Sequence, residues 1–302
     1  MGSESMARRV GSLGTMLRDL AGAALPLSAR GLGQEIEERL QKIPTRLNEY
    51  GFDQFGLEPA GVKSQLLFSA LLYRYYFRVE TRGIEKVPSG RVLLISNHAG
   101  QLPFDGMMLG VAMLLEAEPP RIARGMGEYW IPQLPFISVS AIRSGSMVGT
   151  PENCVQMLEA DECVMVFPEG VRGMNKLFRE RYKLQRFGQG FVRLALETET
   201  PIVPVGIVGS EEQQPGLANV PQLARLFGMP AFPLTLGFPW LGPLGILPLP
   251  VKYRIYFGDV LRFEGSPTEE DAAIQDKVDA VRDAIHGLLQ RGRDERKGIF
   301  RG

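Results

Sequence analysis

The chain has 302 residues, a mass of 33.4 kDa and 34 basic against 34 acidic side chains. A chain of this length can bury a full hydrophobic core, and its zero net charge gives it no general attraction to nucleic acid, so we expect no nucleic-acid partner. Its two histidines and two cysteines do not have the spacing of metal ligands, so we expect no metal site.

The first 77 residues are predicted to form a helical segment. Apolar residues recur at helical spacing over 10–27, which indicates an amphipathic helix that docks on the protein or lies on a membrane surface. A second apolar stripe covers 36–47 and is interrupted by Pro44. The stretch 62–77 is too short and too charged to span a bilayer, and its tyrosines suit an interfacial helix as well as simple core packing.

From residue 78 onward, predicted strands alternate with predicted helices. The predicted strands cover 78–81, 92–96, 121–124, 138–143, 163–167, 202–208 and 252–257. The predicted helices cover 104–115, 151–160 and 187–198. Such alternation is typical of an α/β domain with a largely parallel sheet flanked by helices, in which ligands gather at the carboxyl ends of the strands. We expect this domain to span 78–265.

The stretch 229–251 contains no charged side chain and six prolines, which exclude a membrane-spanning helix. We expect a non-helical apolar loop that lines an acyl-chain cavity and dips into the outer layer of a lipid leaflet. Burial of the loop against the core is the alternative.

Residues 266–302 are predicted to form a C-terminal helix and a basic tail that pack on the same domain. Ser266, Pro267 and Glu269 have the arrangement of a capping box with proline at the first helical position. The inward stripe of this helix is predicted to comprise Ile274, Val278, Val281, Ile285 and Leu288. His286 lies beside the stripe, and we assign it a structural role.

His98 and Asp105 lie in the loop that connects the apolar run 92–95 to the helix predicted at 104–115. A histidine and an aspartate on one loop can act as a general base and the carboxylate that orients it, which is the arrangement that deprotonates a hydroxyl nucleophile. The alternative is a polar loop in which the histidine caps a helix.

A second polar stretch, FPEGVRG at 167–173, follows the apolar run 163–166. Together, in this order and at this separation, the two stretches resemble the glycerolipid acyltransferase superfamily, typified by bacterial 1-acylglycerol-3-phosphate acyltransferases. That family carries a His, four residues and an Asp in its first motif and a Phe-Pro-Glu-Gly-Thr-Arg-like third motif. Here six residues separate His98 from Asp105, and Val171 replaces the Thr, which indicates a divergent branch.

The resemblance implies a fold, a reaction and a set of site residues. The fold is a glycerol-3-phosphate acyltransferase-like mixed, largely parallel sheet with an N-terminal helical extension. The reaction moves a fatty acyl group from acyl-CoA or acyl-carrier protein, as donor substrate with no cofactor, to the hydroxyl of a lysophospholipid such as 1-acylglycerol-3-phosphate. His98 is the implied general base and Asp105 its orienting group. Glu169, Gly170 and Arg172 are implied to protrude and hold the glycerol and phosphate of the acceptor.

Arg143 stands where the second motif of the family is expected, and it is a further candidate phosphate ligand. For Arg143 and Arg172 the alternative is a surface ion pair, for example Arg172 with Glu169. The basic run 176–183 can recruit the phosphates of coenzyme A, an acidic carrier protein or anionic lipid, or it can be a solvated loop.

The expected partners are therefore an acyl thioester, a lipid acceptor and a membrane surface, with the protein bound peripherally or monotopically at the cytoplasmic face. Two other functions remain open. The first is an acyltransferase with a neutral acceptor such as diacylglycerol or a long-chain alcohol. The second is a non-catalytic lipid-binding protein, because Asp105 is displaced from the usual spacing.

Overall fold

The computed structural model describes residues 27–100, 102–127, 129, 137–226 and 232–301. The amphipathic helix predicted at 10–27 lies outside these ranges except for its last residue.

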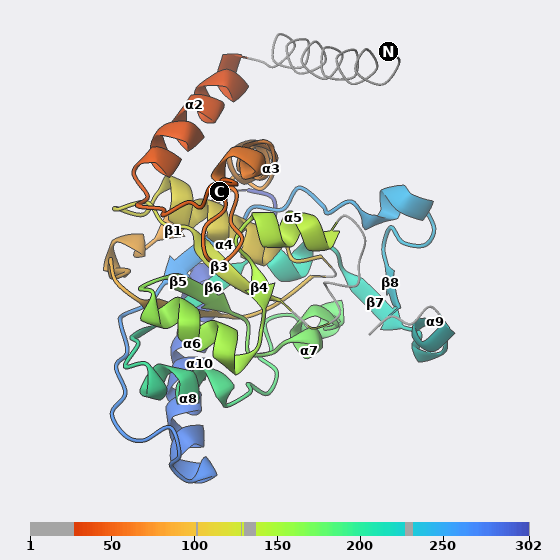
Figure 1. Ribbon diagram of the computed structural model, residues 1–302. Coiled ribbons are helices and arrows are strands. Elements are labelled where there is room, and N and C mark those ends of the chain that lie inside the picture. Colours follow the sequence, from red (N-terminus) through yellow and green to blue (C-terminus); the bar gives the residue numbers. More distant parts are fainter. Residues whose placement is uncertain (1–26, 101, 128, 130–136, 227–231, 302) are drawn as a thin grey trace, which may run out of the picture.

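A mixed sheet forms the centre of the molecule (Figure 1). Its seven strands run in the order β1 (Glu80–Arg82), β9 (Arg254–Phe257), β6 (Ile202–Val208), β2 (Val92–Ser96), β5 (Cys163–Val166), β3 (Ala123–Gly127) and β4 (Met147–Val148). All neighbouring strands are parallel except β6 and β9, which are antiparallel. This order confirms the predicted mixed, largely parallel sheet.

The two central strands determine where the functional loops meet. β2 and β6 are apolar over nearly their whole length and buried at every residue, as expected of strands covered on both faces. In the register of β2 with β5, Ile95 pairs with Val166. The loops that follow these two strands therefore leave the sheet side by side at the same edge.

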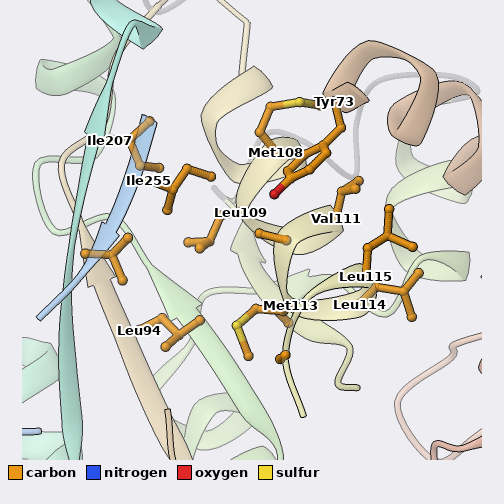
Figure 2. Close-up of a cluster of buried hydrophobic side chains, with 14 of the residues drawn as sticks. Tyr73, Leu94, Met108, Leu109, Val111, Met113, Leu114, Leu115, Ile207 and Ile255 are labelled. Carbon is orange, nitrogen blue, oxygen red and sulfur yellow. The ribbon is translucent and has the colours of Figure 1, made fainter. Parts of the chain in front are cut away.

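Alternate residues of β2 enter two separate cores, because successive side chains point to opposite faces of a sheet. Leu94 joins the core formed with α4 (Phe104–Leu115), α2 (Leu27–Gln41) and α3 (Pro59–Leu71). Figure 2 shows Leu94, Ile207 and Ile255 of the sheet facing Met108 and Leu109 of α4. Leu93 and Ile95 join the opposite core, with α6 (Pro151–Glu159), α8 (Gly190–Glu197) and α10 (Asp271–Glu295).

The remaining elements are short and lie in the connecting segments. They are the helices α5 (Ile137–Arg143), α7 (Val171–Met174) and α9 (Pro221–Leu226), the turns η2 (Ile84–Lys86), η4 (Phe178–Glu180), η5 (Ser210–Glu212) and η6 (Gly242–Ile246), and the hairpin strands β7 (Gly216–Asn219) and β8 (Pro233–Thr235).

The stretch predicted as a helix at 62–77 is α3 followed by the π-helical turn η1 (Leu72–Tyr76). Tyr73 and Phe77 are buried in the core, whereas Phe68 and Tyr75 are more than half exposed. The segment thus packs on the domain and presents aromatic side chains at the surface. Among the residues that the structure describes, we find no helix that combines the length and the apolar composition needed to cross a membrane.

The prediction of a strand at 138–143 is wrong, because this segment forms helix α5. A short apolar run does not by itself distinguish a strand from a helix. Val139 and Ile142, three residues apart on one helical face, are about half exposed, so the segment lies on the surface and not in the sheet.

The C-terminal helix begins later than predicted, at Asp271, with Glu270 as its N-cap. The expected contact does form, because the backbone N–H of Ser266 donates to Glu269 Oε1 at 3.1 Å. However, Arg193 donates to the carbonyls of Pro267 and Glu269, which holds this stretch as a separate turn. At the end of the predicted stripe, Leu289 and not Leu288 is fully buried.

Candidate active site

His98 and Asp105 meet at the carboxyl end of β2. His98 lies two residues after the strand, and Asp105 lies in the first turn of α4. The Nδ1 atom of His98 is 2.8 Å from Asp105 Oδ2, which also accepts the N–H of Ala99 at 2.9 Å. The longer loop therefore still brings the two side chains together. It turns at Gly100, whose φ of +85° is one that other residues rarely adopt.

The contact with Asp105 determines which nitrogen of His98 is available for chemistry. Because Nδ1 faces the buried carboxylate, Nδ1 carries the proton and Nε2 is left as the basic nitrogen. The imidazole packs against the ring of Phe167, with 4.5 Å between ring centroids. The side chain is thus fixed in one orientation while 8% of the residue remains accessible.

Glu169 does not protrude toward a substrate, and our expectation that it does is wrong. Its side chain is fully buried. Its Oε1 accepts the backbone N–H of His98 at 2.9 Å, and its Oε2 accepts the backbone N–H of Gln185 at 2.7 Å. Gly170 allows this arrangement because its φ of +54° lets α7 start immediately after Glu169. Glu169 therefore ties the loop after β5 to the backbone of His98.

Lys176 is buried between two carboxylates and is not part of a solvated basic surface. Its Nζ lies 3.1 Å from Glu169 Oε2 and 3.0 Å from Glu211 Oε1. Burial raises the pKa of Glu211 to about 7, although the charge of Lys176 acts in the opposite direction. The backbone N–H of Tyr182 donates to Glu211 Oε2 at 2.6 Å. These groups form a buried carboxylate–ammonium–carboxylate triad behind His98.

Sequence reasoning missed Glu211 and its neighbours. The polar run from Ser210 to Gln214 is buried, and it follows β6 directly. The available signal was its position, because this run lies at the carboxyl end of a strand that neighbours β2.

Parts of this chain are similar to known proteins. The family model named Acyltransferase matches residues 78–208, which contain both polar stretches. Uncharacterized proteins of Mycobacterium tuberculosis and Mycobacterium bovis are 41% identical over 263 residues, which cover 84% of this chain and 73% of theirs. Residues 78–208 of this chain therefore belong to the acyltransferase family.

Two more distant proteins extend the comparison. A mouse protein named DGAT1/2-independent enzyme synthesizing storage lipids is 24% identical over 216 residues, 70% of this acyltransferase and 60% of the mouse protein. The crystal structure of the 1-acyl-sn-glycerophosphate acyltransferase PlsC from Thermotoga maritima superposes with a TM-score of 0.53 at 14% identity, covering 78% of this chain and 81% of that one. The latter likeness supports the predicted fold.

Arg172 and Arg143 differ in their surroundings. Arg172 is exposed on α7, and it makes no hydrogen bond or ion pair with any residue in the described ranges. The Nε atom of Arg143, at the end of α5, lies 3.3 Å from Glu58 Oε2 in a half-exposed ion pair. The structure therefore leaves Arg172 available to an anion and gives Arg143 the surface ion pair that was its alternative.

The pKa of His98 in this acyltransferase is raised above its ordinary value of 6.5. Burial acts to lower the pKa, but the negative charge of Asp105 and the hydrogen bond to it outweigh burial. The charge of Glu169 raises the pKa further, and the charge of Lys176 lowers it.

This shift predicts the pH dependence of the reaction. A general base acts in its neutral form, so a raised pKa moves the loss of activity on the acidic side to higher pH. We expect kcat/KM to fall below a midpoint that lies above 6.5, and we expect Asp105→Asn to move this midpoint to lower pH. The measurement is a kcat/KM profile from about pH 5 to about pH 9. A midpoint that is the same in both proteins would contradict the assignment of His98.

Proposed function

We propose that the protein transfers a fatty acyl group from acyl-CoA or acyl-carrier protein to the hydroxyl of a lysophospholipid such as 1-acylglycerol-3-phosphate. The observation that carries this proposal is the His98–Asp105 pair, which leaves Nε2 of His98 as the basic nitrogen at the edge of the sheet, in a residue that is 8% exposed. A non-catalytic lipid-binding role loses its motivation, because the displaced Asp105 still reaches the imidazole.

The reaction needs one base and a bound pair of substrates. Nε2 of His98 takes the proton of the acceptor hydroxyl while its oxygen attacks the thioester carbonyl carbon. The tetrahedral intermediate then collapses, the C–S bond breaks, and the leaving thiolate receives the proton from the imidazolium. Asp105 stabilises the imidazolium between these steps, as in the Ser-His-Asp arrangement, except that the nucleophile belongs to the substrate.

Arg172 is the group that we expect to bind the acceptor phosphate, because an exposed guanidinium that has no partner among the described residues can donate two hydrogen bonds to one phosphate. Arg172→Ala should lower kcat/KM for lysophosphatidic acid by about tenfold or more, chiefly through KM. The measurement is thiol release from palmitoyl-CoA in detergent micelles, with Arg143→Ala as the matched control.

The second candidate function, acyl transfer to an uncharged acceptor such as diacylglycerol, is supported by the mouse relative named for storage-lipid synthesis. It predicts that Arg172→Ala is harmless and that phosphorylated acceptors are poor substrates.

We place this reaction at a membrane surface, on the cytoplasmic face, because the acceptor carries a long acyl chain. Free, buried Cys154 and Cys163 are consistent with a reducing compartment. The exposed aromatic side chains of α3 and η1 provide part of the apolar surface that such a location requires.

A further inference from the structure

The segment 234–250, which begins within β8 and ends before β9, carries a group of exposed apolar side chains. In Figure 1 it projects at the right-hand edge of the molecule, beyond the β7–β8 hairpin, and then returns to the sheet. Five of its large apolar residues are 60–70% exposed: Leu236, Trp240, Leu241, Leu244 and Leu247. The sequence 229–251 carries no charge. Large exposed apolar side chains grouped in one segment are typical of an interaction site.

The segment is held in place by hydrogen bonds to its backbone. The hydroxyl of Tyr76 donates to the carbonyl of Pro248 at 2.6 Å, and Arg78 donates to the carbonyl of Pro250 at 2.7 Å. The backbone N–H of Leu249 donates to the carbonyl of Gln213 at 2.7 Å. Because the backbone is anchored, the apolar side chains remain at the surface and do not fold into the core.

A cavity of about 250 Å³ lies under this segment. The residues described around it belong to the segment, to η1 and to the polar run after β6, and none of them carries a charge. Gln214 lines the cavity and only 6% of it is exposed, yet its Oε1 has no hydrogen-bond partner among the residues that the structure describes. An unpaired buried carbonyl is costly, and a ligand with a hydroxyl or N–H group can satisfy it.

The cavity shares a wall with the catalytic loop. Gln213 lines it, and the side-chain amide of Gln213 donates to the carbonyl of Leu102, within the loop from His98 to Asp105, at 3.4 Å. The hydroxyl of Tyr253 donates to Oε1 of the same Gln213 at 2.5 Å, which fixes the amide. Gln213 therefore connects the wall of the cavity to the loop that carries His98 and Asp105.

We propose that the segment 234–250 inserts into a lipid surface and that the cavity beneath it binds the glyceryl end of an uncharged acylglycerol, one hydroxyl of which donates to Gln214 Oε1. The proposal rests on the proposed acyl transfer and concerns its second candidate acceptor, an uncharged acylglycerol. A lipid surface fits better than a protein partner, since a protein interface has a polar rim and the segment offers no charge for one. The cavity is smaller than those that enclose a drug-sized ligand, so the acyl chain must extend along the exposed side chains.

The insertion is tested without reference to activity, by co-sedimentation of the full chain with phosphatidylcholine vesicles. We expect the wild type to bind these uncharged vesicles equally at low and high salt. Leu244→Glu should weaken binding by about tenfold or more, because a leucine side chain no longer enters the apolar layer. The matched control is Val260→Glu. Val260 is also exposed, but it follows β9, whereas the segment precedes β9.

Three results would overturn the insertion: wild-type protein that stays in the supernatant, wild-type binding by Leu244→Glu, or binding that needs anionic lipid and disappears at high salt. The last result would assign the contact to basic side chains.

The cavity is tested with 1-monooleoylglycerol as acceptor. Gln214→Leu should raise KM for this lipid about fivefold, the effect of one lost hydrogen bond, with kcat nearly unchanged. Gln189→Leu, at the N-cap of α8 in the opposite layer, is the control. An unchanged KM would overturn the assignment of the cavity. If the wild type transfers acyl groups to no acceptor, the proposed function fails, and vesicle binding still decides the insertion.

Discussion

Replacing His98 with alanine should lower the rate of acyl transfer by about a hundredfold or more, because the acceptor hydroxyl loses the proposed general base. Asp105→Asn should have a comparable effect, since Asp105 Oδ2 holds Nδ1 of His98 at 2.8 Å and fixes the tautomer that leaves Nε2 basic. The measurement is release of free thiol from palmitoyl-CoA with lysophosphatidic acid as acceptor in detergent micelles, repeated with a carrier-protein donor and with a neutral acceptor.

The control for this experiment is the other histidine of the chain. His286 is exposed on α10, so His286→Ala should keep wild-type activity. Thermal unfolding of each variant separates a lost base from a lost fold, because Asp105 is buried and also accepts the N–H groups of Ala99 and Gly106. A folded His98→Ala protein that retains wild-type turnover would leave the lipid-binding role as the better description.

The central strands and the contact between His98 and Asp105 could be predicted from the sequence. β2 and β6 occupy the predicted ranges, and α4 has the predicted bounds, because long apolar runs between turn residues report burial on both faces of a sheet. The rule that ligands gather at the carboxyl ends of parallel strands then placed His98 and the stretch from Glu169 to Arg172 at one edge.

The role of Glu169 could not be predicted, because it depends on residues far along the chain. Its carboxylate follows a strand in a polar loop, which locally resembles an exposed ligand. The groups that cover it are the N–H of Gln185 and the ammonium of Lys176, which is in turn fixed by Glu211, 35 residues further on. Burial of a charged side chain is thus a tertiary property that the local pattern does not contain.

The errors in secondary structure have similar causes. The apolar residues of 137–143 fit a strand or a helix, and the surface position beside α3 allows the helix. The capping residues Ser266 and Glu269 do form their contact, but Arg193, on a distant helix, bonds to the carbonyls of Pro267 and Glu269 and delays the start of α10. In both cases a long-range contact decides between two locally acceptable conformations.

Lys176→Met should destabilise the fold by about 3–5 kcal/mol, because it leaves Glu169 and Glu211 as buried carboxylates without their shared cation. Activity should fall as well, since Glu169 also holds the backbone N–H of His98. The measurement is urea unfolding, with Lys183→Met as the matched control, because Lys183 is exposed at the end of the same basic run. A variant that unfolds at the wild-type urea concentration would show that the triad contributes no net stability.

The pH dependence of this loss distinguishes unpaired charge from simple loss of packing. The pKa of Glu211 in the wild type is raised from 4.5 to about 7, so the folded state holds a proton that the unfolded state releases, and the resulting stability is lost as pH rises through about 7. Lys176 lowers this pKa, so the pKa of Glu211 is higher in the Lys176→Met variant, and the pH range over which stability is lost extends to higher pH. The variant should therefore lose more stability relative to wild type at about pH 8 than at about pH 5.

Adding Glu211→Gln to Lys176→Met should recover part of the loss at the higher pH, because it removes one of the two unpaired charges. A loss that is the same at both values would mean that Lys176 acts through packing of its side chain and not through its charge.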